Sequence, residues 1–270
     1  MVTLKKFPKT RIQKWRHGTQ FLATALLSLK MPLDRLLPNV DLTRVCLPVF
    51  QCHGCPLAQF ACPVGVLAFS AAMHVWPVYV IGAILLAATF SGRLFCGWAC
   101  PFGFIQDLLF KIPVPGKFLL PRWTGAGKFL ALAGLVVIGP MLTGAAVGNL
   151  LYFCNVCPAG ALEASLPLRL FTHRAMQSAK WVALFVPLAL MIWTPRPFCK
   201  VMCPLGAILS LGNRISLFRI RVKSAPCSMC KVCQRACPGD AFVIEDPNTG
   251  DCIRCLQCKE VCPDERVGFS

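Results

Sequence analysis

The chain has 270 residues, of which 56% are hydrophobic and only 14% are charged, and its formal net charge is +17. Ordinary soluble domains carry about 25% charged residues, so the composition excludes a typical water-soluble protein and predicts contact with a lipid bilayer. The basic residues flank apolar segments and form no single patch. This argues against nucleic acid as a partner and favours attraction to anionic lipid.

Residues 1–40 are predicted to form a basic N-terminus with one short apolar segment. That segment runs from Phe21 to Leu29 and is broken by Lys30, Pro32 and Asp34. It is the shortest candidate for a transmembrane helix and stands as a possible first crossing.

Three longer uncharged stretches can each cross a bilayer. They run from Val64 to Phe90, from Phe129 to Phe153 and from Trp181 to Pro195. We therefore expect a mainly α, polytopic membrane protein with three or four transmembrane helices and a membrane domain over residues 41–220.

The three spans divide the cysteines between two sides. One side has Cys46, Cys52, Cys55, Cys62, Cys154 and Cys157, and the other has Cys96, Cys100, Cys199, Cys203 and the C-terminal tail. The second side is also richer in basic residues, which are Arg93, Lys111, Lys117, Arg122, Lys128, Arg196, Lys200, Arg214, Arg219, Arg221 and Lys223. The positive-inside rule then predicts a bacterial inner (cytoplasmic) membrane protein whose tail is cytoplasmic.

A Cys-Pro-x-Gly motif occurs four times, beginning at Cys62, Cys100, Cys157 and Cys203. Each copy precedes an apolar run, and proline is well suited to the first position of a helix. Residues of about 45–110 and 150–215 thus form two copies of one unit, and such repeats commonly share a site at their interface.

The cysteines of the second side predict one cluster between the repeats. Phe95-Cys96-x-x-x-Cys100-Pro101 and Phe198-Cys199-x-x-x-Cys203-Pro204 are near-copies, each with two cysteines about one helical turn apart. Helix N-termini would direct N–H groups at an anionic [4Fe–4S] cluster. The alternative is that these are free cysteines that pack as small hydrophobic residues.

The outer cysteines leave the ligand set open, because six are present and one cube needs four. One option takes Cys52, Cys55 and Cys62 with Cys154 or Cys157; another takes Cys46 with the first three and leaves a redox dithiol at Cys154 and Cys157. A structural disulfide between the last two is a third reading. We favour a cluster drawn from both repeats, because it mirrors the inner site.

Residues 221–270 are predicted to form an α+β ferredoxin module with two [4Fe–4S] clusters. Two runs of four cysteines are each followed by proline, with the spacing of two-cluster bacterial ferredoxins. In that arrangement the fourth cysteine of each run reaches the other cube, whereas a zinc site would more naturally show two pairs. The predicted ligand sets are Cys227, Cys230, Cys233 and Cys262 for one cluster, and Cys252, Cys255, Cys258 and Cys237 for the other.

With these motifs the chain resembles membrane-bound polyferredoxins of the NapH/NosR/CcoG type over about residues 80–270. The resemblance implies a quinol or cytoplasmic electron donor, and a periplasmic reductase or maturation system as acceptor. The outer cysteines depart from the NapH pattern, so a role in nitrate reduction is not carried over, and an uncharacterised branch is indicated.

We therefore expect an electron-transfer component of an oxidoreductase system rather than a stand-alone enzyme. It would relay electrons between a cytoplasmic donor or the quinone pool and a periplasmic or membrane partner. The alternatives are a maturation protein that reduces a metal centre or disulfide of a client, and a redox sensor. No phosphate loop, dinucleotide fingerprint or hydrolytic triad is found, so the chemistry is redox.

Overall fold

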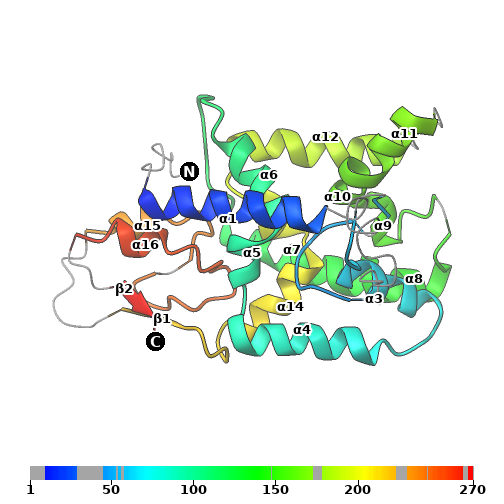
Figure 1. Cartoon of the computed structure of the whole chain (residues 1–270), viewed down its shortest axis with the longest axis horizontal. Coiled ribbons are helices and arrows are strands. Elements are labelled where there is room, and N and C mark those ends of the chain that lie inside the picture. The colour runs from blue at the N-terminus through cyan, green and yellow to red at the C-terminus, as the bar shows by residue number, and fades with distance from the viewer. Residues whose placement is uncertain are drawn as a thin grey trace.

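Helices make up most of the described structure, as the composition predicted. A computed structural model describes residues 10–28, 45–52, 54–55, 58–146, 148–172, 178–222, 230–241, 243–263 and 267–269. Four long helical segments run along the long axis of the molecule (Figure 1). They are α1 (Arg11–Leu27), α4 (Val78–Ser91), the run η2 (Arg122–Ala126), α7 (Gly127–Ala131), η3 (Leu132–Ile138) and α8 (Gly139–Thr143), and α12 (Ser178–Trp193).

Among the described residues, one continuous helix is long and apolar enough to cross a bilayer. It is Arg122–Thr143, with 22 residues, and it ends at Gly144, whose φ of 72° is readily adopted by glycine. Three shorter apolar helices are Pro63–Ala72, Val78–Ser91 and Ser178–Trp193.

The expectation of a single helix from Val64 to Phe90 is wrong. This stretch forms α3 (Pro63–Ala72) and α4, separated by a break at His74, which has a φ of 55°. Pro77 immediately precedes α4; it lacks an N–H and disfavours helical geometry in the residue before it. The apolar run therefore turns back on itself. The possible crossing from Phe21 to Leu29 falls in α1 up to Leu27, and its end lies outside the described residues.

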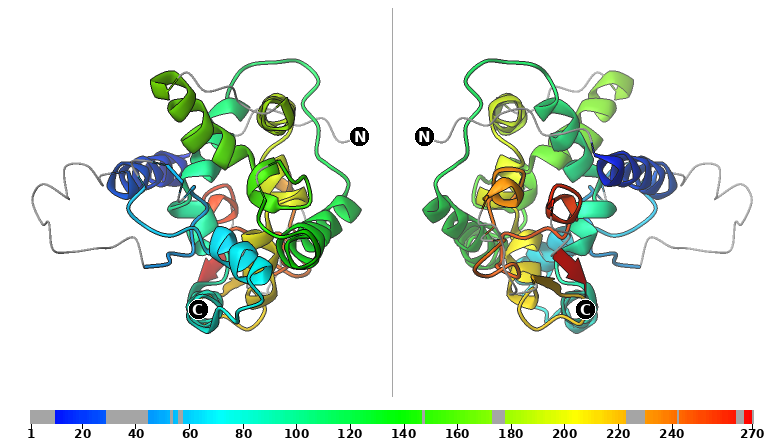
Figure 2. Two further views of the ribbon diagram at one scale, coloured as in Figure 1. Left: turned by 90° about the vertical axis from the view of Figure 1, so that its right-hand side faces the viewer. Right: turned by 90° about the vertical axis from the view of Figure 1, so that its left-hand side faces the viewer.

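Two short helices follow α4 and two follow α12. They are α5 (Leu94–Trp98) and α6 (Pro101–Phe110) in the first repeat, and α13 (Pro197–Val201) and α14 (Pro204–Gly212) in the second. α4 packs on α14 and α12 packs on α6, so each repeat covers the other. Seen from either end, the long helices surround these central segments (Figure 2).

The two ends of the molecule hold different structures (Figure 1). One end contains α3 with α9 (Phe153–Val156), α10 (Pro158–Gly160), η4 (Ala161–Ser165) and α11 (Leu166–Thr172). The other end contains the C-terminal module, in which β1 (Ile220–Val222) and β2 (Val267–Phe269) pair antiparallel beside α15 (Val232–Arg235) and α16 (Gln257–Glu260).

Candidate iron–sulfur sites

The cysteine of every Cys-Pro-x-Gly motif caps the N-terminus of a helical segment, with φ between −78° and −71° and ψ between 110° and 120°. Proline follows at the first helical position, so the predicted helix starts are confirmed. The glycine N–H then donates to the sulfur of its own motif: Gly160 N lies 3.4 Å from Cys157 Sγ, and Gly206 N lies 3.3 Å from Cys203 Sγ. These donors suit a thiolate.

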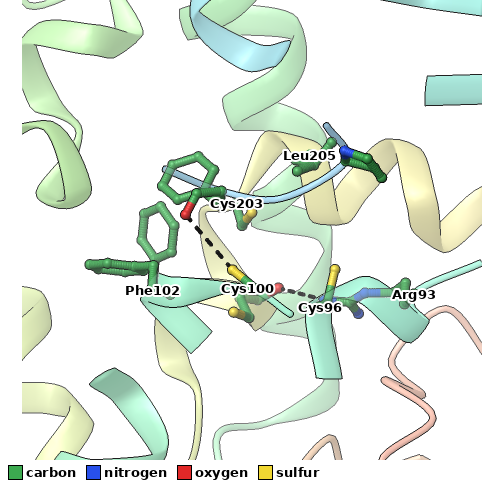
Figure 3. Close-up of a pocket in the computed structure, with 10 residues that line it drawn as sticks. Arg93, Cys96, Cys100, Phe102, Cys203 and Leu205 are labelled. Atoms are coloured by element: carbon green, nitrogen blue, oxygen red, sulfur yellow. Dashed lines mark hydrogen bonds between the residues drawn. The ribbon is translucent and has the colours of Figure 1, made fainter. Parts of the chain in front are cut away.

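The inner site brings the four cysteines of the central helices around one small cavity. Figure 3 shows Cys96, Cys100 and Cys203 around this space, with Arg93 on one side and Phe102 on the other. Cys199 lines the same cavity, and all four side chains are buried. A buried cavity with two thiols from each repeat and N–H donors fits a [4Fe–4S] cluster with four cysteine ligands.

Burial governs the chemistry of these thiols. It raises the pKa of Cys100 to about 12, and the neighbouring Cys199 and Cys96 add to this effect. Metal ligation requires thiolates, so cluster assembly here must release protons. Within the described ranges, no group of three or more His, Cys, Asp or Glu is arranged to hold a single metal ion; the inner thiols instead share a larger space.

Two arginines enclose the inner site in a reciprocal manner. Arg93 and Arg196 stand three residues before Cys96 and Cys199, the first inner-site cysteine of each repeat, and both are at most 3% exposed. Arg93 Nη2 donates to the carbonyl oxygen of Cys199 at 3.2 Å, and Arg196 Nη1 donates to that of Cys96 at 2.7 Å. Each repeat therefore contacts the cysteine loop of the other.

The two arginines differ in their counter-charges. Arg196 forms a bidentate pair with Asp107 at 2.9 and 2.6 Å, and Arg16 bonds the same carboxylate at 3.0 Å. Burial would raise the pKa of Asp107, but the two guanidinium groups hold it well below its usual range. Among the described residues, no carboxylate forms an ion pair with Arg93. Burial would lower its pKa, whereas the nearby Cys96, Cys199 and Cys203 raise it.

Part of the basic side predicted from the sequence is not a surface at all. Arg93, Arg196, Lys128 and Lys200 are buried. Lys128 Nζ pairs with Asp251 at 2.9 Å, and Lys200 Nζ donates to a carbonyl oxygen at the same distance. These four charges are therefore held inside the protein.

In the C-terminal module, the structure brings one predicted ligand set together. Cys237, Cys252, Cys255 and Cys258 line one small cavity. Burial raises the pKa of Cys252 to about 11. Of the other set, Cys233 and Cys262 pack in the same apolar cluster, Cys230 is exposed, and Cys227 lies outside the described residues.

The module packs directly against the inner site. Gly97 approaches so closely that a Cβ there would lie 2.4 Å from the carbonyl oxygen of Ile253. Trp98 Nε1 donates to the carbonyl oxygen of Arg254 at 3.0 Å, and Asn213 Nδ2 donates to that of Cys252 at 2.8 Å. The loop that carries three module cysteines is thus fixed beside α5.

The outer site combines cysteines of both repeats. Burial raises the pKa of Cys62, and the neighbouring Cys154 and Cys52 raise it further. Burial likewise raises the pKa of Cys157, with further contributions from Cys62, Cys52 and Cys154. A Cβ at Gly160 would lie 3.6 Å from Cys52 Sγ. This neighbourhood favours a set drawn from both repeats.

The remaining outer groups have contacts of their own. Burial raises the pKa of Cys52, and the neighbouring Cys55 adds a smaller effect. Cys46 forms a backbone bridge with Ala61, beside Cys62. Cys154 and Cys157 are free thiols in the structure, without a disulfide. Glu163 Oε2 accepts a hydrogen bond from Cys52 N at 2.7 Å, and burial raises the pKa of this carboxyl to about 7.

Four phenylalanine rings contact one another beside the inner cysteines, and three of them, Phe50, Phe102 and Phe198, line the inner cavity. Phe50 contacts Phe153 at 6.2 Å, Phe198 at 5.2 Å and Phe102 at 5.9 Å between ring centroids, and Phe102 lies 5.0 Å from Phe198. They belong to one apolar core that also includes Cys62, Cys157 and three inner cysteines. Sequence reasoning assigned no site role to these rings or to the two arginines, although Arg-x-Phe-Cys occurs once in each repeat.

Comparison with known proteins agrees with these motifs. The family described as "4Fe-4S binding domain" matches residues 73–122 and 181–223, one segment in each repeat. An uncharacterised protein of Methanocaldococcus jannaschii is 30% identical, over 69% of this chain and 76% of its own length. The ferredoxin-type protein NapH of Haemophilus influenzae is 29% identical, over 71% and 68%.

The putative electron transport protein YccM of Escherichia coli is 24% identical, over 71% of this chain and 54% of its own length. No solved structure matches the chain. The two matched segments contain the inner cysteines, and the expected resemblance to NapH and NosR is confirmed. The chain belongs to the family of ferredoxin-type 4Fe-4S proteins that includes NapH, NosR and YccM.

Proposed function

We propose that this chain is a membrane-bound relay that passes electrons between a cytoplasmic partner and a partner at the opposite membrane face. The observation that carries this proposal is the order of the cysteine groups along the long axis: the C-terminal module, then the central helices, then the end with α3, α9 and α10 (Figure 1). The ferredoxin-type and electron-transport relatives of this chain also support a role in electron transfer.

When bound, a [4Fe–4S] cluster supplies one-electron redox chemistry. The residues of this chain hold the thiolates, exclude water and connect the sites. Gly97 and Trp98 contact the module loop, and the four phenylalanine rings belong to the same apolar core as inner and outer cysteines.

A location in the bacterial inner membrane is supported by the apolar helices. In addition to Arg122–Thr143, helices α4 and α12 are apolar. Large side chains such as Leu85, Leu142 and Val182 are 53%, 78% and 63% exposed along these segments. Apolar surfaces of this extent suit lipid. The basic residues that remain exposed near the module, such as Arg214 and Arg221, support a cytoplasmic orientation for it.

A quinone is the second proposed partner. An open pocket of about 440 Å³ lies between α7, α14 and the Gly250–Asp251 turn. Its lining combines the apolar Phe129 and Leu211 with charged groups, which are Arg122, Lys128, Arg214 and Asp251. Its volume falls in the range of small-molecule sites. Leu211→Trp should then block reduction of the protein by a quinol but not by dithionite. Equal reduction by the quinol in both proteins would exclude this pocket.

The relay is tested on anaerobically purified protein. Iron and acid-labile sulfide counting with EPR should give four clusters: two in the module, one at the inner site and one at the outer site. In oriented vesicles, reductant at the cytoplasmic face should reduce the outer site. Colourless protein, zinc in place of iron, or an outer site that never exchanges electrons with the module would each refute the proposal.

Maturation of a client remains the rival function if Cys154 and Cys157 act as a dithiol. Their neighbours Cys52 and Cys62 favour a cluster instead. Cys154→Ser separates the two functions: a relay loses the outer cluster signal, whereas a client-reducing dithiol loses client activation with all cluster spectra intact.

A further inference from the structure

We propose that Arg93 is the fixed counter-ion of the inner site and its link to the C-terminal module, so that it raises the reduction potential of that site. The inference rests on the proposed relay function and adds a positioning residue to it. Arg93 is buried, contacts both redox sites and has no carboxylate bonded to it among the described residues.

The contacts of Arg93 join two redox sites. Its side chain is 2% exposed. Nη1 donates to the carbonyl oxygen of Gly250 at 2.6 Å, and Nη2 donates to that of Cys199 at 3.2 Å. Gly250 stands two residues before Cys252 of the module. One planar guanidinium group, with donors in a fixed fork, therefore bonds to the backbone on both sides of the interface.

The positive charge of Arg93 lacks a protein partner of opposite sign within the described chain. The Nε atom of Arg93 is buried and donates no hydrogen bond in the described structure. The nearby Asp251 is paired with Lys128. A buried, unpaired cation is strongly destabilising. Burial would lower the pKa of Arg93, whereas the nearby Cys96, Cys199 and Cys203 raise it, followed by the more weakly acting Asp251. A thiolate-bound cluster at the inner site would supply a negative charge beside Arg93.

Arg196 shows what a neutralised equivalent looks like. It occupies the same position in the second repeat and makes the reciprocal contact to Cys96, but Asp107 pairs with it in bidentate geometry. The repeats thus place two related arginines at one site, and only the side of Arg93 lacks a bonded carboxylate in the described structure. The arginine without a bonded carboxylate, Arg93, is the one that contacts the module at Gly250.

One motif glycine makes room for Arg93. A Cβ at Gly206 would lie 3.2 Å from Arg93 Nη2, closer than ordinary van der Waals contact, whereas a Cβ at Gly103 would lie at an ordinary 3.5 Å from Arg196 Nη2. Gly206 therefore admits the arginine of the first repeat. This contact explains the glycine of that copy of the motif, which the capping cysteine and the following proline do not explain.

The electrostatic consequence has a definite sign. When one electron passes from the module to the inner site, the module loses one negative charge and the inner site gains one. No bond breaks and no proton moves, because the guanidinium stays charged throughout. A cation at short range in a buried site stabilises the more negative, reduced state, so Arg93 raises the potential of the inner site.

The test is an EPR-monitored redox titration of the full-length protein. The inner signal is identified as the one missing from Cys199→Ser. Arg93→Gln should retain the iron content and lower the equilibrium constant for reduction of the inner site at least tenfold, about 59 mV for one electron. Arg93→Lys keeps the charge and should stay within threefold of the parent. Arg214→Gln removes a charge whose side chain is 75% exposed and should also stay within threefold, because solvent screens it.

Each outcome has one reading. An unchanged potential in Arg93→Gln with full iron content overturns the inference, and so does an equal fall in Arg93→Lys and Arg93→Gln. If Arg93→Gln fails to assemble the inner cluster, Arg93→Lys decides: assembly at the parent potential supports the counter-ion, and failure of both overturns it. Absence of any inner cluster in the parent protein would instead refute the relay itself.

Discussion

At the scale of single residues, the close approach of two backbone segments determines how the C-terminal module packs against the inner site. Gly97 in α5 leaves no space for a side chain, because the carbonyl oxygen of Ile253 occupies it. On the same face, Trp98 bonds to the following residue of the loop. The interface therefore depends on a small residue at one position and on a hydrogen-bond donor at the next.

Gly97→Ala should separate the module from the inner site. The added methyl would lie 2.4 Å from a backbone oxygen. Overpacking of this kind commonly lowers the free energy of unfolding by about 1–3 kcal/mol. Thermal unfolding in detergent and the rate of inner-site reduction by the module measure both effects. Gly82→Ala is the matched control, since nothing lies within 4 Å of its Cβ. Equal behaviour of the two variants would contradict the interface.

The outer ligand set can be decided by two matched substitutions. Cys157→Ser should remove about four iron atoms per chain, the content of one cube, because Cys157 lies among the thiols of both repeats. Cys46→Ser should retain them if the ligand set is drawn from both repeats. Iron counting and EPR report the result. Loss of iron in Cys46→Ser alone would favour the set confined to the first repeat.

At the scale of elements, helix termini connect parts of the chain that are distant in sequence. Helix α1 begins beside α16, and the carboxylate of Glu260 accepts hydrogen bonds from the backbone N–H groups of Arg11 and Ile12, the latter at 2.7 Å. A carboxylate at a helix N-terminus satisfies free donors and complements the helix dipole. The N-terminal helix is thereby attached to the C-terminal module.

Glu260→Gln should loosen this attachment. The loss of the charge should destabilise the first turn of α1 by roughly 0.5–1 kcal/mol, which hydrogen exchange of the amides of Arg11 and Ile12 would register as faster exchange. Glu245→Gln, at an exposed position of the same module, removes an equal charge and should leave those amides unchanged. Similar protection in both variants would exclude the cap.

At the scale of the whole molecule, the long helix of each repeat packs on a central helix of the other repeat. α4 of the first repeat packs on α14 of the second, and α12 packs on α6. The central cysteines are consequently enclosed by both halves, with the module on one side and the outer cysteines on the other (Figure 1). A single interruption at the centre should divide the proposed path into two.

Cys199→Ser should produce that interruption. Reductant supplied at the module face should still reduce the module clusters, whereas the outer site should remain oxidised, because the intermediate site is missing. EPR of vesicles frozen at successive times distinguishes the sites. Reduction of the outer site at the parent rate would show that electrons bypass the central helices. Ser91→Ala, which replaces a hydroxyl bonded within α4, serves as a control for handling and should leave the path intact.

Local features of this protein could be read from the sequence by itself. Cysteine spacing predicted which thiols of the tail share a cavity, and Cys-Pro-x-Gly predicted four helix starts, because ligand spacing and helix capping act over a few residues. The tertiary structure alone decided the break between α3 and α4, the burial of Arg196, and the bond from Arg93 to Cys199, residues 106 positions apart. Such contacts depend on how the two repeats pack. The order of residues in the sequence does not show which distant groups come into contact when the repeats pack together.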